Sequence, residues 1–215
     1  GELNGSTDYI SVPHTTSLDL TAGALSIECW VYCTANGSAD YPGIISKKSN
    51  SGDAKADWGL TLQESTKKIE SWINAGGVDY HFWSTNAIGT GAWHQLLLVY
   101  NGSTLKFYID NVENGSTSAS GNLRDSALDL WIGRHGSDQN SRNWNGKIDL
   151  VRIWSRALSS GERSSLYNSG SARLLNMTTG SLEINLPTAV SSQATFIIKR
   201  TSEVTININA DGDET

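Results

Sequence analysis

The chain is built from short runs of alternating apolar and polar residues that end at tight-turn dipeptides. These dipeptides recur as Asn36-Gly37, Gly76-Gly77, Asn101-Gly102, Asn114-Gly115 and Asn145-Gly146. Asn and Gly accept the positive φ that two-residue hairpin turns need, so they mark antiparallel hairpins. Gly is abundant (21) and Pro is rare (3), and no long run has helical periodicity. The 215 residues therefore predict an all-β, two-sheet antiparallel sandwich with one core.

One segment combines a strand with a short helix. On the strand 147–154, alternation places Asp149 on the same face as Val151 and Ile153, and opposite Ile148. Both faces carry apolar residues, so both are expected to be at least partly covered.

A short helix is expected directly after this strand. Ser159 and Glu162 stand at the spacing of a capping box, in which each side chain bonds to the other residue's backbone N–H. Leu166 and Tyr167 can then fold this amphipathic turn back onto the sheet.

Four ordered motifs span most of the chain: residues 3–13 with 26–31, residues 93–110, residues 132–134 and residues 143–170. Together they resemble the laminin-G-like (LamG) family of concanavalin A-like jelly rolls, over about residues 1–172. The resemblance implies one jelly-roll domain at 1–172. At Asn111 the family usually has glycine, but Asn tolerates the left-handed conformation, so the turn is expected to survive.

Residues 173–215 are interpreted as a linker and a C-terminal β-strand segment. Strand character resumes at 181–187, 195–200 and 204–209. Three short strands cannot bury a core alone, so they are expected to pack on the jelly roll or on copies of themselves.

This C-terminal segment resembles a β-repeat of phage and other viral tail-fibre and structural proteins. The match rests on residues 186–189, 198–200 and 204–215. The resemblance implies a homotrimer formed through this segment, as the start of a stalk or assembly module, and a place on a virion surface or outside the cell.

Charge and hydropathy exclude two classes of partner. The net charge is −6, and Lys and Arg are scattered rather than clustered, which argues against nucleic-acid binding. No apolar run approaches the roughly 20 residues of a membrane helix, so membrane insertion is not expected.

The two cysteines are expected to be buried and unbridged. Cys29 and Cys33 lie four residues apart on one strand, which separates them by about 13 Å. A disulfide needs Cα atoms within about 7 Å.

The sequence does not predict an enzyme. Retaining glycoside hydrolysis needs two carboxylates about 5 Å apart, and the paired acids of glucanases with this fold are absent. The histidines, which are His14, His81, His94 and His135, show no nucleophile or metal-ligand spacing.

Sugar binding is the favoured use of one sheet face, because aromatic rings stack on pyranoses while polar side chains bond to hydroxyls. If two strands present their mixed faces together, Trp72, His81 and Trp83 form a saccharide platform; scattered exposed aromatics are the alternative. Of the other tryptophans, Trp58 and Trp131 are also not assigned to packing by the family motifs.

The loop 136–143 is a second candidate for ligand contacts. Asp138, Asn140 and Arg142 can line the rim of a binding site, or the loop is an ordinary solvated one.

The family resemblance also implies that the domain could bind one structural Ca²⁺. Asp149 is the best candidate ligand if it is partly buried, with carbonyls near Asn4 and Gly5; an Asp satisfied by protein N–H groups is equally compatible.

Two classes of function follow. The first is a non-catalytic recognition or adhesion domain of a viral, phage-like fibre or virion surface that binds glycans or a host surface receptor. The second is a structural or decoration domain that mediates protein–protein assembly. A secreted bacterial carbohydrate-binding module is a variant of the first.

Overall fold

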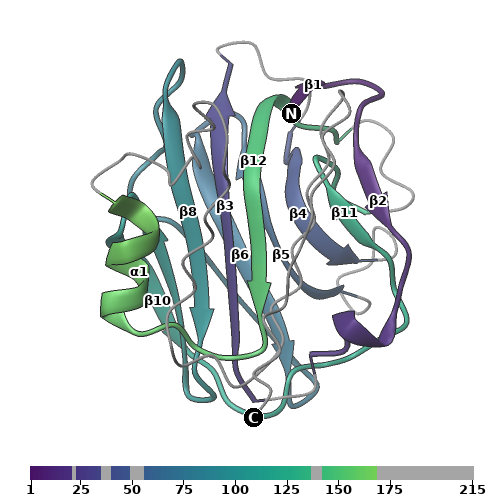
Figure 1. The fold of residues 1–215 in the computed structure, drawn as a ribbon, viewed down its shortest axis with the longest axis vertical. Coiled ribbons are helices and arrows are strands. Elements are labelled where there is room, and N and C mark those ends of the chain that lie inside the picture. The colour runs from purple at the N-terminus through teal and green to yellow at the C-terminus, as the bar shows by residue number, and fades with distance from the viewer. Residues whose placement is uncertain (21–22, 35–39, 49–55, 137–141, 169–215) are drawn as a thin grey trace, which may run out of the picture.

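The computed structural model describes residues 1–20, 23–34, 40–48, 56–136 and 142–168. Within these residues the chain forms two antiparallel sheets of six strands each, which face one another (Figure 1). Sheet A has the order β1-β12-β3-β8-β9-β10, and sheet B the order β2-β11-β4-β5-β6-β7. The predicted two-sheet sandwich is confirmed.

The elements have the following bounds. Sheet A consists of β1 (Glu2–Asn4), β3 (Leu25–Cys33), β8 (Trp93–Tyr100), β9 (Thr104–Ile109), β10 (Val112–Ser118) and β12 (Asn145–Trp154). Sheet B consists of β2 (Ile10–Val12), β4 (Gly43–Lys48), β5 (Ala56–Gln63), β6 (Lys68–Ala75), β7 (Val78–Trp83) and β11 (Leu130–Ile132). The helical elements are a 3-10 turn, η1 (Thr16–Leu18), and α1 (Ser160–Tyr167).

The core lies between the sheets. One cluster joins Ile27 and Leu98 of sheet A to Leu60 and Ile73 of sheet B, and none of these four side chains is exposed. The alternating apolar positions of the sequence supply this layer, so the opposite face of each sheet is free to carry other residues.

Both cysteines lie in this core, on β3. Cys29 and Cys33 are free and buried, as the sequence predicts. Burial raises the pKa of both thiols. They pack as small apolar groups.

Two of the predicted turn dipeptides form hairpin turns: Gly76-Gly77 between β6 and β7, and Asn101-Gly102 between β8 and β9. The predicted turns at Asn114-Gly115 and Asn145-Gly146 are wrong, because the first lies within β10 at a register shift and the second begins β12. Asn36-Gly37 lies outside the described residues. Gly76 and Gly77, between β6 and β7, have φ values of 60° and 79°. Asp110 and Asn111, between β9 and β10, have φ values of 52° and 63°. Asn111 therefore takes the left-handed conformation expected of it.

Strand β12 contains a β-bulge that overturns one expectation. Its register with β3 shifts immediately after Asp149, and Leu150 has a φ of 47°. The extra residue reverses the alternation. Val151 and Ile153 consequently pack toward the core together with Ile148, whereas Asp149 is exposed. The prediction that Asp149 shares a face with Val151 and Ile153 is wrong, as is its expected partial burial.

Helix α1 covers part of the outer face of sheet A, beside β8 (Figure 1). The predicted capping box is present: Ser159 Oγ accepts from the Glu162 N–H, and Glu162 Oε2 accepts from the Ser159 N–H. Leu166 packs against an apolar cluster on this face, and the Tyr167 ring stacks on Trp30 with centroids 6.1 Å apart. In the part of the chain that the structure describes, no helix is long and apolar enough to cross a bilayer.

The segment 173–215 lies outside the described residues, as do Asp138 and Asn140. The domain division, the viral β-repeat and the trimer therefore stay predictions.

Candidate functional site

The structure brings Trp72, His81 and Trp83 together on the outer face of sheet B. Trp72 on β6 is the direct cross-strand partner of His81 on β7, and Trp83 pairs with Glu70 in the same hairpin. The intervening β6 residues, such as Ile73, point into the core. The predicted sharing of one face is confirmed, because side chains of paired residues project to the same side of a sheet.

Trp72 differs from the other two in being buried. Its side chain occupies the space above Gly59 on β5: a Cβ added at Gly59 would lie 2.3 Å from Trp72 Cζ2. Trp72 is only 9% exposed, whereas the His81 side chain is 61% exposed and Trp83 is half-buried. Trp72 therefore forms the floor of this face, and His81 and Trp83 are its accessible members.

A continuous series of ring and cation contacts crosses this face. Trp83 lies against Tyr41, with ring centroids 5.9 Å apart, and the Arg142 guanidinium carbon lies 5.6 Å from the Tyr41 centroid. Arg142 Nη1 lies 3.1 Å from His135 Nδ1. The series continues from His135 to Trp72 at 5.6 Å and from Trp72 to Lys48 Nζ at 5.8 Å. We refer to the following six residues as the outer-face cluster: Tyr41, Lys48, Trp72, Trp83, His135 and Arg142.

The position of Arg142 joins two predictions that the sequence kept apart. The Arg142 carbonyl accepts a hydrogen bond of 3.1 Å from Gly43 N at the start of β4, which holds this end of the loop 136–143 against sheet B. A guanidinium can only donate, so His135 Nδ1 is the acceptor in their contact. Arg142 thus lies within the same cluster as Trp72 and Trp83.

A second group of rings lies at the β2–β11 side of the same sheet. The Arg134 guanidinium carbon is 4.6 Å from the Tyr9 ring centroid and 5.2 Å from that of Trp131. Tyr9 is 42% exposed and Trp131 is half-buried. We refer to Tyr9, Trp131 and Arg134 as the Arg134 sandwich.

The register aligns this sandwich with the platform. Trp131 pairs with Ser46, Ser46 with Gly59, and Gly59 with Trp72. The row ends at His81. Ser46 and Gly59 are small residues that lie between the tryptophans Trp131 and Trp72 in this row. This arrangement can be recognised only once the strand order is known.

The sequence prediction missed Tyr41, Lys48, His135 and the Arg134 sandwich. Arg134 and His135 follow β11 after Gly133 and directly precede the loop 136–143, which the sequence did indicate as a candidate site. Trp131 was the one residue of this group that the sequence indicated, because the family motifs assigned no packing role to it.

Two acidic groups of this face lie on the β6–β7 hairpin. His81 Nδ1 is 3.3 Å from Glu70 Oε1. Asp79 Oδ1 accepts a 2.5 Å hydrogen bond from Asn74 Nδ2. The cationic groups Lys48, Arg134 and Arg142 lie on or beside β4 and β11.

The structure does not bring together the three residues proposed for Ca²⁺. Asn4 pairs with Asn145, which places it about 13 Å along β12 from Asp149. Asn4 Oδ1 already accepts hydrogen bonds from the backbone N–H groups of Ser6, Thr7 and Asp8, in the loop that follows it. Among the described residues no group of three or more His, Cys, Asp or Glu side chains is placed to hold a metal. Calcium binding stays a prediction without an assembled site.

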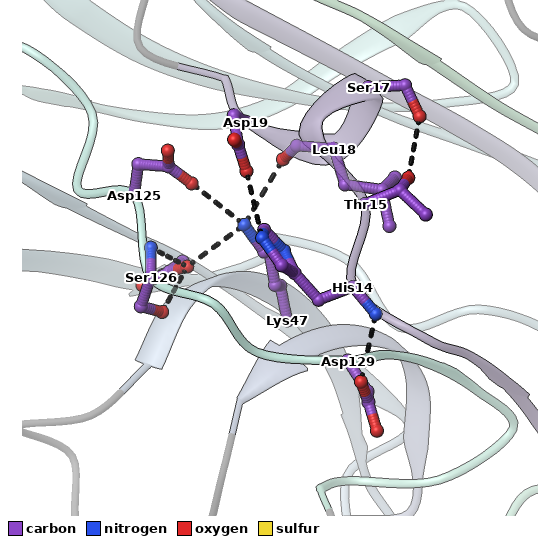
Figure 2. Close-up of polar contacts among 10 residues, drawn as sticks. His14, Thr15, Ser17, Leu18, Asp19, Lys47, Asp125, Ser126 and Asp129 are labelled. Carbon is purple, nitrogen blue, oxygen red and sulfur yellow. Dashed lines mark hydrogen bonds and ion pairs between the residues drawn. The ribbon is translucent and has the colours of Figure 1, made fainter.

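The ammonium group of Lys47 on β4 is buried among carboxylate and carbonyl oxygens (Figure 2). Lys47 Nζ lies 3.0 Å from Asp125 Oδ1, 3.1 Å from the Leu18 carbonyl oxygen and 3.5 Å from Asp57 Oδ2. The Lys47 side chain is 1% exposed and that of Asp57 is not exposed. Ser126 donates to Asp57 Oδ2 from both its N–H and its hydroxyl.

This buried ion cluster ties separate chain segments to β4 and β5. Burial raises the pKa of Asp57, against the lowering effects of the Ser126 hydrogen bonds and of Lys47. Because every oxygen around Lys47 Nζ comes from a different segment, the cluster is a cross-link between loops and sheet rather than a ligand site.

The fold and the outer face define a lectin-like β-sandwich. Residues 4–162 match the Laminin_G_3 family, described as the concanavalin A-like lectin/glucanases superfamily. The chain belongs to this family. No protein with a curated function matches the sequence.

Solved structures share the fold at low sequence identity. Domain 4 of AbnA, an extracellular GH43 arabinanase from Geobacillus stearothermophilus solved with arabinotriose, is 21% identical, with a TM-score of 0.59 over 77% of this chain and 75% of that one. A Bacteroides ovatus protein for which carbohydrate binding has been proposed is 20% identical, with a TM-score of 0.56 over 71% of this chain. The binding domain of botulinum neurotoxin serotype G is 17% identical, with a TM-score of 0.58 over 79% of this chain. The match covers 42% of each of the latter two.

Proposed function

We propose that the chain is a non-catalytic recognition domain that binds glycans on the outer face of sheet B. The observation behind this proposal is the outer-face cluster, in which Trp83 and Tyr41 present half-buried rings beside the guanidinium of Arg142. Such rings stack on the apolar face of a sugar, and flanking polar groups bond to its hydroxyls.

The comparisons support the same proposal. The family description names lectins, and the structural relatives include a domain solved with arabinotriose and a toxin binding domain. Glucanases also share the family description, so the absence of catalysis is part of the proposal.

The biological setting is proposed from the sequence. The resemblance of residues 173–215 to viral fibre repeats favours a homotrimeric phage-like fibre or virion surface, outside the cell. Several weak sites on one fibre would gain avidity by linkage, which suits a platform of only a few rings. A structural Ca²⁺ is retained as a component to test.

A glycan array tests the proposal. The wild-type protein, Trp83→Ala and Trp93→Ala are each applied with Ca²⁺ and with chelator. Trp93, which is 41% exposed on the opposite sheet, is the matched control. We expect Trp83→Ala to lose binding by tenfold or more and Trp93→Ala to bind like the wild type.

Other outcomes point elsewhere. If the folded wild-type protein binds no glycan, the assembly or decoration role replaces this proposal. If Trp93→Ala and Trp83→Ala lose binding equally, the outer face of sheet B is not the site. If the wild-type protein binds with Ca²⁺ but not with chelator, this result would support the proposed Ca²⁺ site.

A further inference from the structure

We propose that the site selects acidic glycans, with Arg142 as the group that binds the sugar carboxylate or sulfate. The inference rests on the proposed function, because it assigns a ligand class to the same face. It starts from the surroundings of Arg142 rather than from the rings.

Arg142 is half-buried beside groups that do not neutralise it. Its contacts are the imidazole of His135 and the ring face of Tyr41. Among the described residues no carboxylate lies within 4.0 Å of its guanidinium, although ten other lysines, arginines and histidines form such pairs, at Lys47, Lys67, Lys106, Lys147, Arg124, Arg152, Arg156, His14, His81 and His94. A partly desolvated cation without an acidic partner favours an anion from outside.

The contacts of Arg142 also orient it. His135 Nδ1 accepts from Nη1, and the guanidinium carbon lies over the Tyr41 ring. A guanidinium has five N–H donors in a rigid fork, so other donors remain for a ligand. Carboxylate and sulfate oxygens match this fork through two parallel hydrogen bonds.

The rest of the face is arranged for the same ligand. Lys48, at the other end of the outer-face cluster, adds positive charge on β4. The acids Glu70 and Asp79 are held by His81 and Asn74 on the β6–β7 hairpin. A local concentration of cations is informative because the chain as a whole has a net charge of −6.

The proposed binding mode combines the two chemistries. The sugar ring stacks on Trp83 and Tyr41, and its acidic substituent reaches Arg142 on the other side of Tyr41. A neutral sugar would stack on the same rings but would offer no anionic group to the Arg142 guanidinium.

Binding titrations with matched oligosaccharides test this inference. The probes are a neutral oligosaccharide, its uronic-acid counterpart, its sulfated counterpart and a sialylated one, measured against the wild type, Arg142→Gln, Arg142→Lys and Arg163→Gln. Arg163 is a matched control because its guanidinium carbon lies 4.4 Å from the Tyr108 ring centroid on the opposite sheet.

We expect at least tenfold tighter wild-type binding of one acidic class than of the neutral probe. Arg142→Gln is expected to remove that preference, because it should weaken binding of the acidic probe far more than binding of the neutral probe. Arg142→Lys keeps the charge but not the fork, so it should retain part of the preference. Arg163→Gln should behave as the wild type, and added salt should weaken only the acidic probes.

Three failures are distinguishable. If a neutral glycan binds through Trp83 as tightly as every acidic probe, the acidic selectivity is refuted and the glycan-binding proposal survives. If no probe binds and the array is also empty, the proposed function fails and this inference fails with it. If Arg142→Gln weakens neutral and acidic probes alike, Arg142 is a structural residue and the inference is refuted.

Discussion

Replacement of Lys47 by methionine removes the charge at the centre of the buried ion cluster and nearly conserves side-chain volume. Lys47 Nζ lies within 3.5 Å of both Asp57 and Asp125, and neither the Lys47 nor the Asp57 side chain is more than 1% exposed. The variant therefore leaves a buried carboxylate without its main cation.

Removal of one partner of a buried ion pair costs about 3–5 kcal/mol of unfolding free energy. For a chain of this size, each kcal/mol lowers the melting temperature by about 2–4 °C, so we expect a fall of about 6–20 °C. The cost should also depend on pH. Burial raises the pKa of Asp57, so the folded state binds its proton more readily than the unfolded state, whose pKa is near 3.8. Stability then falls as the pH rises from about 4 toward the raised pKa. Loss of Lys47 raises that pKa further, so the deficit of Lys47→Met should be smaller at pH 4 than at pH 7.

Urea and thermal unfolding at the two pH values measure both effects. The control is Lys106→Met, whose exposed pair with Glu113 should contribute little to the free energy of unfolding. The double variant Lys47→Met with Asp57→Asn should recover part of the loss, because it removes the buried charge that keeps only its ion pair with Arg124. If Lys47→Met unfolds within error of Lys106→Met, the cluster does not stabilise the fold and the reasoning is refuted.

Three further predictions concern other parts of the molecule. Gly59→Val should cost about 1–3 kcal/mol in urea unfolding and weaken glycan binding, because its Cβ would meet Trp72 Cζ2 at 2.3 Å and the overlap must displace the indole; unchanged binding would show that Trp72 is not part of the site. Hydrogen bonds from Arg156 and Ser159 lower the pKa of Glu162 from 4.5 to about 2, so their stabilisation is present above pH 4.5 and is lost as the pH falls toward 2. Because the pair is exposed, urea unfolding over this pH range should show a change in unfolding free energy of well under about 1 kcal/mol, and Glu162→Gln should abolish that change. The two buried thiols should react with Ellman's reagent only after unfolding, and fast labelling of the native protein would contradict their placement in the core.

The sequence predicted local features well because they depend on local chemistry. The capping box of α1, the left-handed turn at Asn111 and the unbridged Cys29 and Cys33 all follow from residue type and spacing. The face of Asp149 was mispredicted for a physical reason. A single inserted residue in β12 exchanges the two faces, and alternation alone does not reveal it.

The candidate site was predicted in part. Trp72, His81 and Trp83 lie on one hairpin, so their common face follows from period-two alternation across a Gly-Gly turn. The burial of Trp72 does not follow, because it depends on Gly59 in the neighbouring strand. Nor does the sequence place Tyr41 beside Trp83 or Arg142 beside Tyr41, since these residues are distant along the chain.

The sequence by itself therefore determined the class of fold, the β6–β7 and β8–β9 hairpins and the two-faced character of each strand, because these depend on side-chain alternation and turn geometry within a few residues. The tertiary structure alone decided which face each outer residue joins and which residues meet there. The strand order β11-β4-β5-β6-β7 sets Trp131, Ser46, Gly59, Trp72 and His81 in one row, and it places Arg142 and His135 over that row. Non-local pairing of this kind is selected by burial of the whole core, which no short stretch of sequence encodes.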